Sequence, residues 1–152
     1  MMTATKPIPG SEEEAVTAVM RSFSRAVGTF DADLMVSLWD PEAETIVYQP
    51  EELHHAIYSR DALHSYIRNL PNVIRGLYDT RVVDRKLEVC GEFAHAYVRF
   101  WCRIERPDDE PMDGQIRQTY LLRKRPSGWF FVQYHESRQV PGFAAPPSRT
   151  EM

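Results

Sequence analysis

The sequence predicts a single α+β domain in which helices pack on a curled, mainly antiparallel sheet. Apolar residues recur at three- and four-residue spacing up to about residue 70, and from Leu77 onward they alternate with polar residues at a period of two. A length of 152 residues is enough for one domain with one hydrophobic core. Helices gathered ahead of an antiparallel sheet are typical of the α+β class.

The first helical segment begins at residue 11, where the sequence reads Ser-Glu-Glu-Glu. This is a capping box, in which the serine oxygen accepts a free backbone N–H and the last glutamate returns the bond. The apolar side chains that share one face of the helix behind it are Val16, Val19, Met20, Phe23, Ala26, Val27 and Phe30. Asp31 then caps a short second helix, which Asp40-Pro41 ends. We expect these two helices to form a hairpin.

A short strand and a third helix follow the hairpin. Residues 45–48 read Thr-Ile-Val-Tyr, a β-branched and aromatic run that Pro50 ends. Ser59 is the expected N-cap of the third helix, and Pro71 lies directly after its last apolar residue. The helical pattern does not recur after this point.

The remainder of the chain predicts four longer strands joined by short polar links. Their ranges are 77–90, 93–106, 115–124 and 129–139. Short links between consecutive strands favour an antiparallel meander. After residue 140 the sequence reads Pro-Gly-Phe-Ala-Ala-Pro-Pro-Ser, which cannot extend a strand ladder. We therefore expect one domain over residues 11–140, between flexible ends at residues 1–10 and 141–152.

Composition narrows the classes of partner and compartment. The net charge is −4, and no basic run of the kind that binds a phosphate backbone occurs, so we expect no nucleic-acid partner. The N-terminus has no apolar signal segment and no stretch of about 18 apolar residues is found, which predicts a cytoplasmic protein without a membrane partner. Cys90 and Cys102 both fall in predicted strands, and we expect them to be reduced core thiols.

The second long strand has two contrasting faces. Its core face carries Ala94, Ala96, Val98, Phe100, Cys102 and Ile104. Its other face carries His95, Tyr97, Arg99, Trp101 and Arg103. This second face is too aromatic for plain solvent exposure and too basic for a dry core, so it predicts a homodimer interface. The alternative is that the C-terminal tail folds over this face.

Local motifs link the sequence to a known superfamily. Residues 91–94 read Gly-Glu-Phe-Ala, Arg117-x-Thr119 is followed by Arg123-Lys124, and residues 128–137 read Gly-Trp-Phe-Phe-Val-Gln-Tyr-His-Glu-Ser. With the order of elements, these motifs resemble the NTF2-like superfamily, in particular its SnoaL-like and ketosteroid-isomerase-like branch, over about residues 12 to 140. The resemblance implies a cone-shaped α+β fold that encloses a pocket. It does not fix a function, because this fold hosts isomerases, cyclases, dehydratases, hydrolases and non-catalytic association domains.

The catalytic groups of two enzyme classes of this superfamily are missing at the matching positions. Ketosteroid isomerases need a carboxylate base and an oxyanion hole made of a tyrosine and a protonated aspartic acid. The tyrosine position falls on Phe23, and the base position falls on Val47 or Tyr48. The protonated acid should lie near Thr119 or Tyr120. The Arg-Asp-Asp set of the epoxide hydrolases is also missing, since we expect no carboxylate on the inward faces of the last two strands.

A different polar cluster is the best candidate for catalysis. Strand parity places on one face Arg117, Thr119, Gln133, His135 and Ser137. If this face borders the pocket, His135 would be a general acid or base and Arg117 would stabilise an oxyanion. The alternative is structural: His135 bonds Ser137 or the backbone, and Arg117 pairs with a nearby carboxylate.

The sequence therefore leaves two functions open. The first is a cofactor-independent cyclase, isomerase or dehydratase that acts on a hydrophobic, polyketide- or steroid-like carbonyl compound. Its pocket residues would be Phe23, Trp39, Tyr48, Tyr66, Thr119, Gln133 and Ser137. The second is a non-catalytic ligand-binding or dimeric association domain. We expect no metal site, because His54, His55 and His64 lack ligand spacing.

Overall fold

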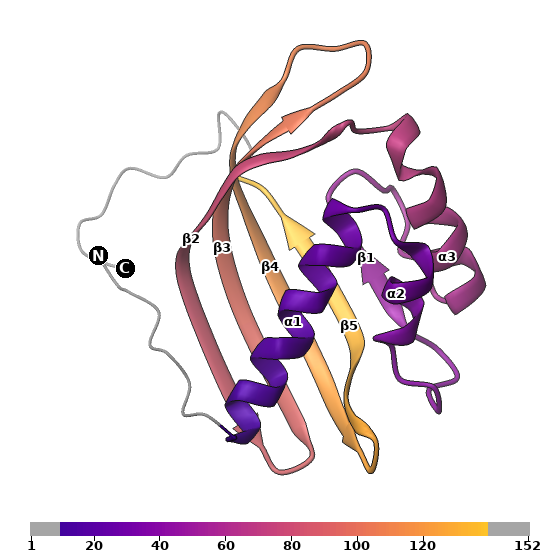
Figure 1. The fold of residues 1–152 in the computed structure, drawn as a ribbon, viewed down its shortest axis with the longest axis vertical. Helices are drawn as coiled ribbons and strands as arrows, with labels where there is room; N and C mark the ends of the chain where they lie inside the picture. Colours follow the sequence, from indigo (N-terminus) through magenta and orange to yellow (C-terminus); the bar gives the residue numbers. More distant parts are fainter. Residues whose placement is uncertain (1–9, 140–152) are drawn as a thin grey trace.

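The computed structural model describes residues 10–139, and the predicted α+β class is confirmed. Helices pack on one side of a five-stranded sheet that is curved and does not close into a barrel (Figure 1). The sequence expectations for the two chain ends, residues 1–9 and 140–152, lie outside the described residues. Within residues 10–139, no helix has the length and apolar character needed to cross a membrane.

Three helices begin at the predicted caps. They are α1 (Glu12–Gly28), α2 (Ala32–Ser37) and α3 (Arg60–Asn69), and a 3₁₀ turn, η1 (Leu70–Asn72), follows α3. At the start of α1 the Ser11 oxygen accepts the Glu14 N–H at 3.1 Å. Asp31 caps α2 through the Leu34 N–H at 2.9 Å, which satisfies one of the free donors of the first turn.

The sheet has the spatial order β1-β5-β4-β3-β2. Its strands are β1 (Val47–Gln49), β2 (Gly76–Cys90), β3 (Phe93–Glu105), β4 (Met112–Arg125) and β5 (Gly128–Ser137). Strands β2 to β5 form the predicted antiparallel meander, and β1 joins β5 in parallel. The last strand therefore lies in the interior of the sheet, paired on both sides.

A bulge in β5 changes which side chains face the helices. Leu121 pairs with Gln133 but Leu122 pairs with Phe131, so Val132 is an extra residue on β5. Phe131 is buried before the bulge, and Tyr134 is buried after it, three positions further on. Because side chains alternate at a period of two, one extra residue moves every later side chain to the opposite face.

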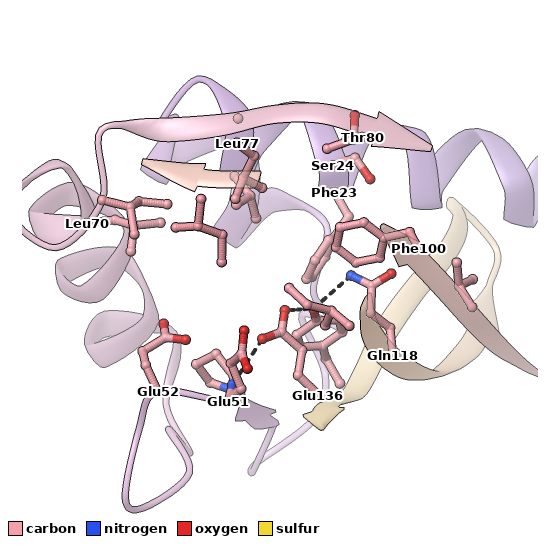
Figure 2. Close-up of a pocket in the computed structure, with 18 of the residues that line it drawn as sticks. Phe23, Ser24, Glu51, Glu52, Leu70, Leu77, Thr80, Phe100, Gln118 and Glu136 are labelled. Atoms are coloured by element: carbon pink, nitrogen blue, oxygen red, sulfur yellow. Dashed lines mark hydrogen bonds between the residues drawn. The ribbon is translucent and has the colours of Figure 1, made fainter. Parts of the chain in front are cut away.

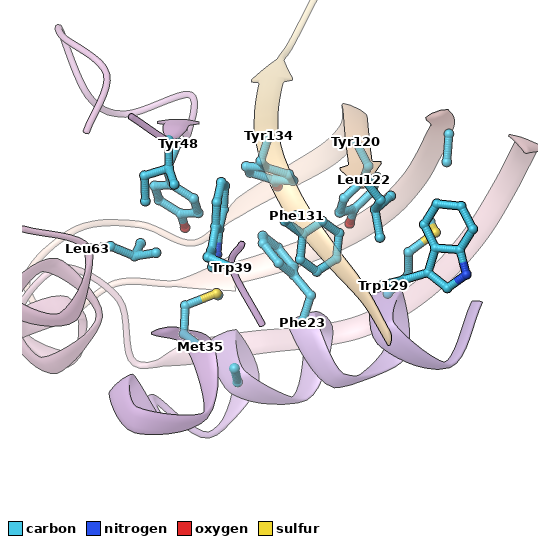
Figure 3. Packing of buried hydrophobic residues seen from close by; sticks show 14 of the residues in the cluster. Phe23, Met35, Trp39, Tyr48, Leu63, Tyr120, Leu122, Trp129, Phe131 and Tyr134 are labelled. Atoms are coloured by element: carbon cyan, nitrogen blue, oxygen red, sulfur yellow. The ribbon is translucent and has the colours of Figure 1, made fainter. Parts of the chain in front are cut away.

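The core is an aromatic layer between the helices and the concave face of the sheet (Figure 3). Phe23 of α1 packs edge-on against Tyr120 and Phe131, with ring centroids 5.4 and 5.1 Å apart. Tyr48 of β1 stacks on Tyr134 at 5.3 Å. Such pairs add to the free energy gained by burying their area. Part of this layer, including Phe23 and Tyr120, also borders a cavity between α1 and the sheet.

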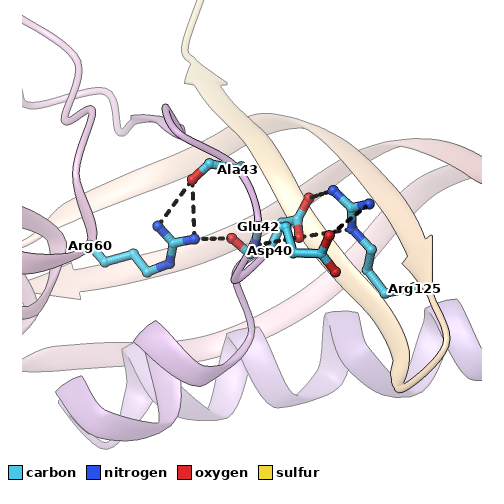
Figure 4. A network of polar contacts seen from close by, with 5 residues as sticks. All are labelled: Asp40, Glu42, Ala43, Arg60 and Arg125. Atoms are coloured by element: carbon cyan, nitrogen blue, oxygen red, sulfur yellow. Dashed lines mark hydrogen bonds and ion pairs between the residues drawn. The ribbon is translucent and has the colours of Figure 1, made fainter.

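A buried ion pair fixes the loop after α2 (Figure 4). The Arg125 guanidinium donates Nε to Asp40 Oδ1 at 3.1 Å and Nη2 to Asp40 Oδ2 at 2.8 Å. The Arg60 guanidinium donates to the carbonyl oxygens of Asp40 and Ala43. Asp40 side-chain exposure is only 1%, so this carboxylate depends on its partner. The network links the α2–β1 loop to α3 and to the β4–β5 hairpin.

The two faces of β3 agree with the prediction, but one cysteine does not. Ala94, Ala96 and Cys102 are buried on the helix-facing side, whereas His95 is exposed on the other. Cys90 was expected in the core and is exposed. The expectation for Cys90 is wrong because this residue is the last of β2, and the side chain that packs against the core is that of the neighbouring Val89. The sheet side away from the helices is called the outer face below.

Candidate active site

A cavity of about 750 Å³ lies between α1, the α3–η1 region and the concave face of the sheet (Figure 2). Its walls are mainly apolar and include Leu70, Leu77 and Phe100. Polar side chains reach it at a few points, among them Gln118 and Glu136. A volume of this size is in the range of small-molecule sites, and an apolar cavity with a few placed polar groups is the usual form of such sites.

Glu136 is the carboxyl group at the base of the cavity. Its Oε1 accepts the backbone N–H of Glu51 at 3.0 Å, and its Oε2 accepts the Tyr134 hydroxyl. Gln118 Nε2 donates in turn to the Tyr134 hydroxyl oxygen at 2.8 Å. This chain of donors from β4 and β5 fixes the orientation of the carboxyl group (Figure 2).

Burial raises the pKa of Glu136 above its ordinary value of 4.5. Removal of water disfavours the carboxylate, and this effect outweighs the hydrogen bonds from Tyr134 and the Glu51 backbone, which favour it. The pKa of Tyr134 is raised for the same reason, so its hydroxyl stays a donor. A carboxyl with a raised pKa in an apolar cavity suits general acid–base chemistry near neutral pH.

Two further glutamates lie beside Glu136, on the loop after β1. Glu51 accepts both Arg138 Nε and Nη2 at 2.6 Å, a two-pronged ion pair that neutralises it. Glu52 has no such partner among residues 10–139, and it keeps contact with solvent at the edge of the cavity. Desolvation and the nearby Glu136 raise the pKa of Glu52 to about 7. Glu52 and Glu136 thus both have a carboxyl pKa that is raised by desolvation.

The predicted catalytic cluster lies on the outer face of the sheet. The structure does bring its members together, because Thr119 pairs with His135 and Arg117 with Ser137 across β4 and β5. Thr119, Gln133 and His135 are exposed, however, and none of the five borders the cavity. The expectation that this face lines the pocket is wrong: on β5 the bulge at Val132 turns Tyr134 and Glu136 inward, and on β4 the inward residues are Gln118 and Tyr120.

Three of the four aromatic residues that were predicted to line the pocket do border the cavity. Phe23, Tyr48 and Tyr66 border the cavity. Trp39 does not; it is buried in the core, where its ring lies 5.8 Å from that of Phe131. The Tyr66 hydroxyl is buried and has no hydrogen-bond partner among the described residues. A buried donor without a partner is costly, and a ligand oxygen would satisfy it.

The sequence prediction missed Glu136 and Gln118, and it expected no carboxylate on the inward faces of the last two strands. That expectation is wrong for β5, since Glu136 borders the cavity. One signal was available. Trp129 and Phe131 are large apolar residues at odd positions, but after Val132 the large apolar residue is at an even position, Tyr134, between the polar Gln133 and His135. Such a change of phase along one strand is a mark of a bulge.

None of the histidines within residues 10–139 borders the cavity. His64 Nε2 bonds Asp33 Oδ1 at 2.8 Å, and the His54 and His55 rings contact each other. A group of donors on the outer face, Glu88, Cys90 and His95, has its ligand atoms within 4.8 Å of one another. All three are exposed, and Glu88 already bonds His95 at 3.1 Å. This group is on the wrong side of the sheet to act in the cavity.

Comparisons with known proteins identify relatives of the fold. The sequence pattern of a SnoaL-like domain matches residues 16–141. No curated protein matches the sequence. A proposed dehydratase of the NTF2-like family from Streptomyces avermitilis superposes with a TM-score of 0.74 at 16% identity, over 87% of this chain and 99% of its own.

Two other solved structures show how varied proteins of this shape are. An NTF2-like superfamily protein from Salmonella enterica has a TM-score of 0.72 at 13% identity, covering 88% of this chain and 97% of its own. The CaMKII hub of S. rosetta has a TM-score of 0.70 at 20% identity, covering 86% and 98%. At these identities the similarity concerns the fold alone.

Proposed function

This chain belongs to the SnoaL-like domain family, and we propose that it is a small-molecule enzyme whose active site is the cavity beneath α1. In this proposal it is a cofactor-independent isomerase, cyclase or dehydratase that moves protons on a hydrophobic carbonyl compound. The observation that carries the proposal is Glu136, a hydrogen-bonded carboxyl with a raised pKa at the base of an apolar cavity.

Glu136 is the proposed general base and acid. In its ionised form it removes a proton from the carbon next to the substrate carbonyl, and the protonated carboxyl returns that proton to another atom. The Tyr134 hydroxyl and the Glu51 N–H hold the carboxyl in one orientation throughout. The unpartnered Tyr66 hydroxyl is the proposed donor to the carbonyl oxygen, where negative charge develops.

The shape of the cavity favours a flat, largely apolar substrate. Phe23, Tyr48 and Tyr66 supply rigid aromatic walls, and the cavity has room for a molecule of two or three fused rings. Polyketide- and steroid-like carbonyl compounds have these properties. An apolar wall also excludes water from the reacting atoms, which strengthens the electrostatic contribution of each polar group.

The test uses 2-tetralone, a bicyclic ketone, as a probe of proton removal. We expect the protein to accelerate exchange of its α-protons in D₂O, followed by ¹H NMR against a buffer blank. The rate should rise with pH as Glu136 loses its proton, and the midpoint should lie above 4.5 because the pKa of Glu136 is raised. No acceleration over the blank, or a midpoint at the ordinary glutamate value, would contradict the proposal.

A second candidate function is association through the outer face of the sheet. It is favoured by the aromatic and basic side chains there, including Trp101, against which the Arg81 guanidinium lies at 4.6 Å. Proteins of the same fold include a CaMKII hub and a proposed CaMKII association domain from Xanthomonas campestris. We propose that two copies of this chain pair through this face, which is compatible with a catalytic cavity on the other side.

Trp101→Glu is expected to dissociate this homodimer. A carboxylate at the centre of an aromatic interface removes an anchor worth about 2 kcal/mol or more, so the dissociation constant should rise at least roughly thirtyfold. Light scattering after gel filtration measures the assembly. The control Tyr58→Glu places the same charge at an exposed aromatic residue outside the sheet and should leave the dimer intact. A monomeric parent protein, or a dimeric Trp101→Glu variant, would contradict the interface.

A further inference from the structure

The cavity has opposite charges at its two sides. Glu51, Glu52 and Glu136 come from β5 and the loop after β1, near one edge of the sheet, whereas Arg85 comes from β2 at the opposite edge and Arg21 borders the cavity from α1. Figure 2 shows Ser24 of α1 and Thr80 of β2 on the side away from Glu51 and Glu52. An apolar space with separated charges favours a ligand that is itself polarised along its length.

Four cavity residues form one row across the sheet. Arg85 pairs with Val98, Val98 pairs with Gln118, and Gln118 pairs with Glu136. All four border the cavity. Three strand spacings of about 4.8 Å separate the ends of the row, so the backbones of Arg85 and Glu136 lie roughly 14 Å apart along the sheet. The row therefore sets the backbone separation between a cationic residue and the proposed catalytic residue.

Two of the arginines that border the cavity are uncommitted. Within residues 10–139, neither Arg21 of α1 nor Arg85 of β2 has a hydrogen bond, ion pair or ring contact. The other two are engaged: Arg81 lies over Trp101, and Arg106 pairs with Asp109 at 3.7 Å and bonds the Glu110 carbonyl. A guanidinium with five free donors at the border of an apolar cavity is suited to bind an anionic oxygen group.

We propose that Arg21 and Arg85 bind the carboxylate end of an amphipathic substrate, whose apolar body fills the cavity and whose reacting carbonyl lies at Glu136. This inference rests on the proposed function for its catalytic end. The orientation follows from charge, because a carboxylate placed beside Glu51, Glu52 and Glu136 would be repelled there. The arginines therefore select the substrate class and orient the substrate.

The test compares two ligands of equal shape, 4-cyclohexylbutanoate and 4-cyclohexylbutanol, by isothermal titration calorimetry at pH 8. The parent protein should bind the carboxylate about tenfold more tightly than the alcohol, as expected for charge-assisted hydrogen bonds that remain partly solvated. The double variant Arg21→Gln/Arg85→Gln should lose this preference and bind the alcohol unchanged. Raising the salt concentration should weaken the binding of 4-cyclohexylbutanoate and leave the binding of 4-cyclohexylbutanol unchanged.

The matched control is Arg25→Gln/Arg68→Gln. It removes the same two charges from exposed positions of α1 and α3 that do not border the cavity, and the preference should persist. Equal binding of the two ligands by the parent protein would overturn the inference, and so would a preference that survives in Arg21→Gln/Arg85→Gln. The calorimetry involves no turnover, so Glu136→Gln should keep the preference. The binding experiment can therefore refute the arginine site without refuting the catalytic role of Glu136, and the exchange experiment can refute that role without refuting the arginine site.

Discussion

Glu136→Gln should lower the rate of 2-tetralone α-proton exchange by about 10²- to 10⁴-fold, the usual contribution of a positioned general base. Glutamine has nearly the same volume, its carbonyl oxygen can still accept the Glu51 N–H, and its NH2 group can donate to the Tyr134 hydroxyl oxygen in place of the bond that the carboxylate accepted. It cannot take up a proton. The cavity should therefore keep its shape and its affinity for the ketone while the chemical step is lost, so that kcat falls and KM changes little.

The matched control for this variant is its neighbour on the same strand. His135→Ala changes a side chain on the outer face, exposed and outside the cavity border. We expect exchange within about twofold of the parent rate. Circular dichroism and the thermal midpoint of each variant report on folding. If His135→Ala abolishes exchange and Glu136→Gln does not, the outer-face histidine is the catalytic group and the present assignment is wrong.

Arg125→Met should destabilise the fold by about 3 kcal/mol. The variant leaves the Asp40 carboxylate, which has 1% exposure, without the two-pronged partner that stabilises its charge. Removing one partner of a buried ion pair lowers the free energy of unfolding by about 3–5 kcal/mol. For a domain of this size the thermal midpoint should fall by about 10 °C. Chemical denaturation at neutral pH measures the free energy of unfolding directly.

The pH dependence identifies the cause of this loss. The Arg125 guanidinium holds the pKa of Asp40 below its ordinary value of 3.8. The ion pair therefore contributes its full stability above pH 3.8, and the contribution is lost as the pH falls through the lower, folded-state pKa. The difference between parent and Arg125→Met should shrink in acid. Adding Asp40→Asn to Arg125→Met should recover part of the stability at neutral pH, whereas a double variant no more stable than Arg125→Met would contradict a role for the stranded charge.

Local signals in the sequence predicted most of the fold. Ser11, Asp31 and Ser59 cap the three helices because each cap depends on residues within one turn. The buried face of β3 was predicted because that strand alternates without a bulge over most of its length. The sequence also placed Thr119 and His135 on the same face of neighbouring strands, and the two residues pair across β4 and β5.

The candidate site was not predictable in the same way. One extra residue at Val132 decides whether His135 or Glu136 faces the cavity, and parity alone does not locate such a bulge. The contact between the Glu51 backbone and Glu136 joins residues 85 positions apart. It depends on the parallel pairing of β1 with β5, which local sequence patterns do not encode.

The most direct measurement is a pH titration of the Glu136 carboxyl by ¹³C NMR, with the resonance assigned by its absence in Glu136→Gln. We predict a midpoint above 4.5, and a further increase when 2-tetralone fills the cavity and removes more water from the carboxyl. A midpoint at or below 4.5 that does not respond to the ketone would show a solvated carboxyl away from the ligand, and would contradict its assignment as the acid–base group.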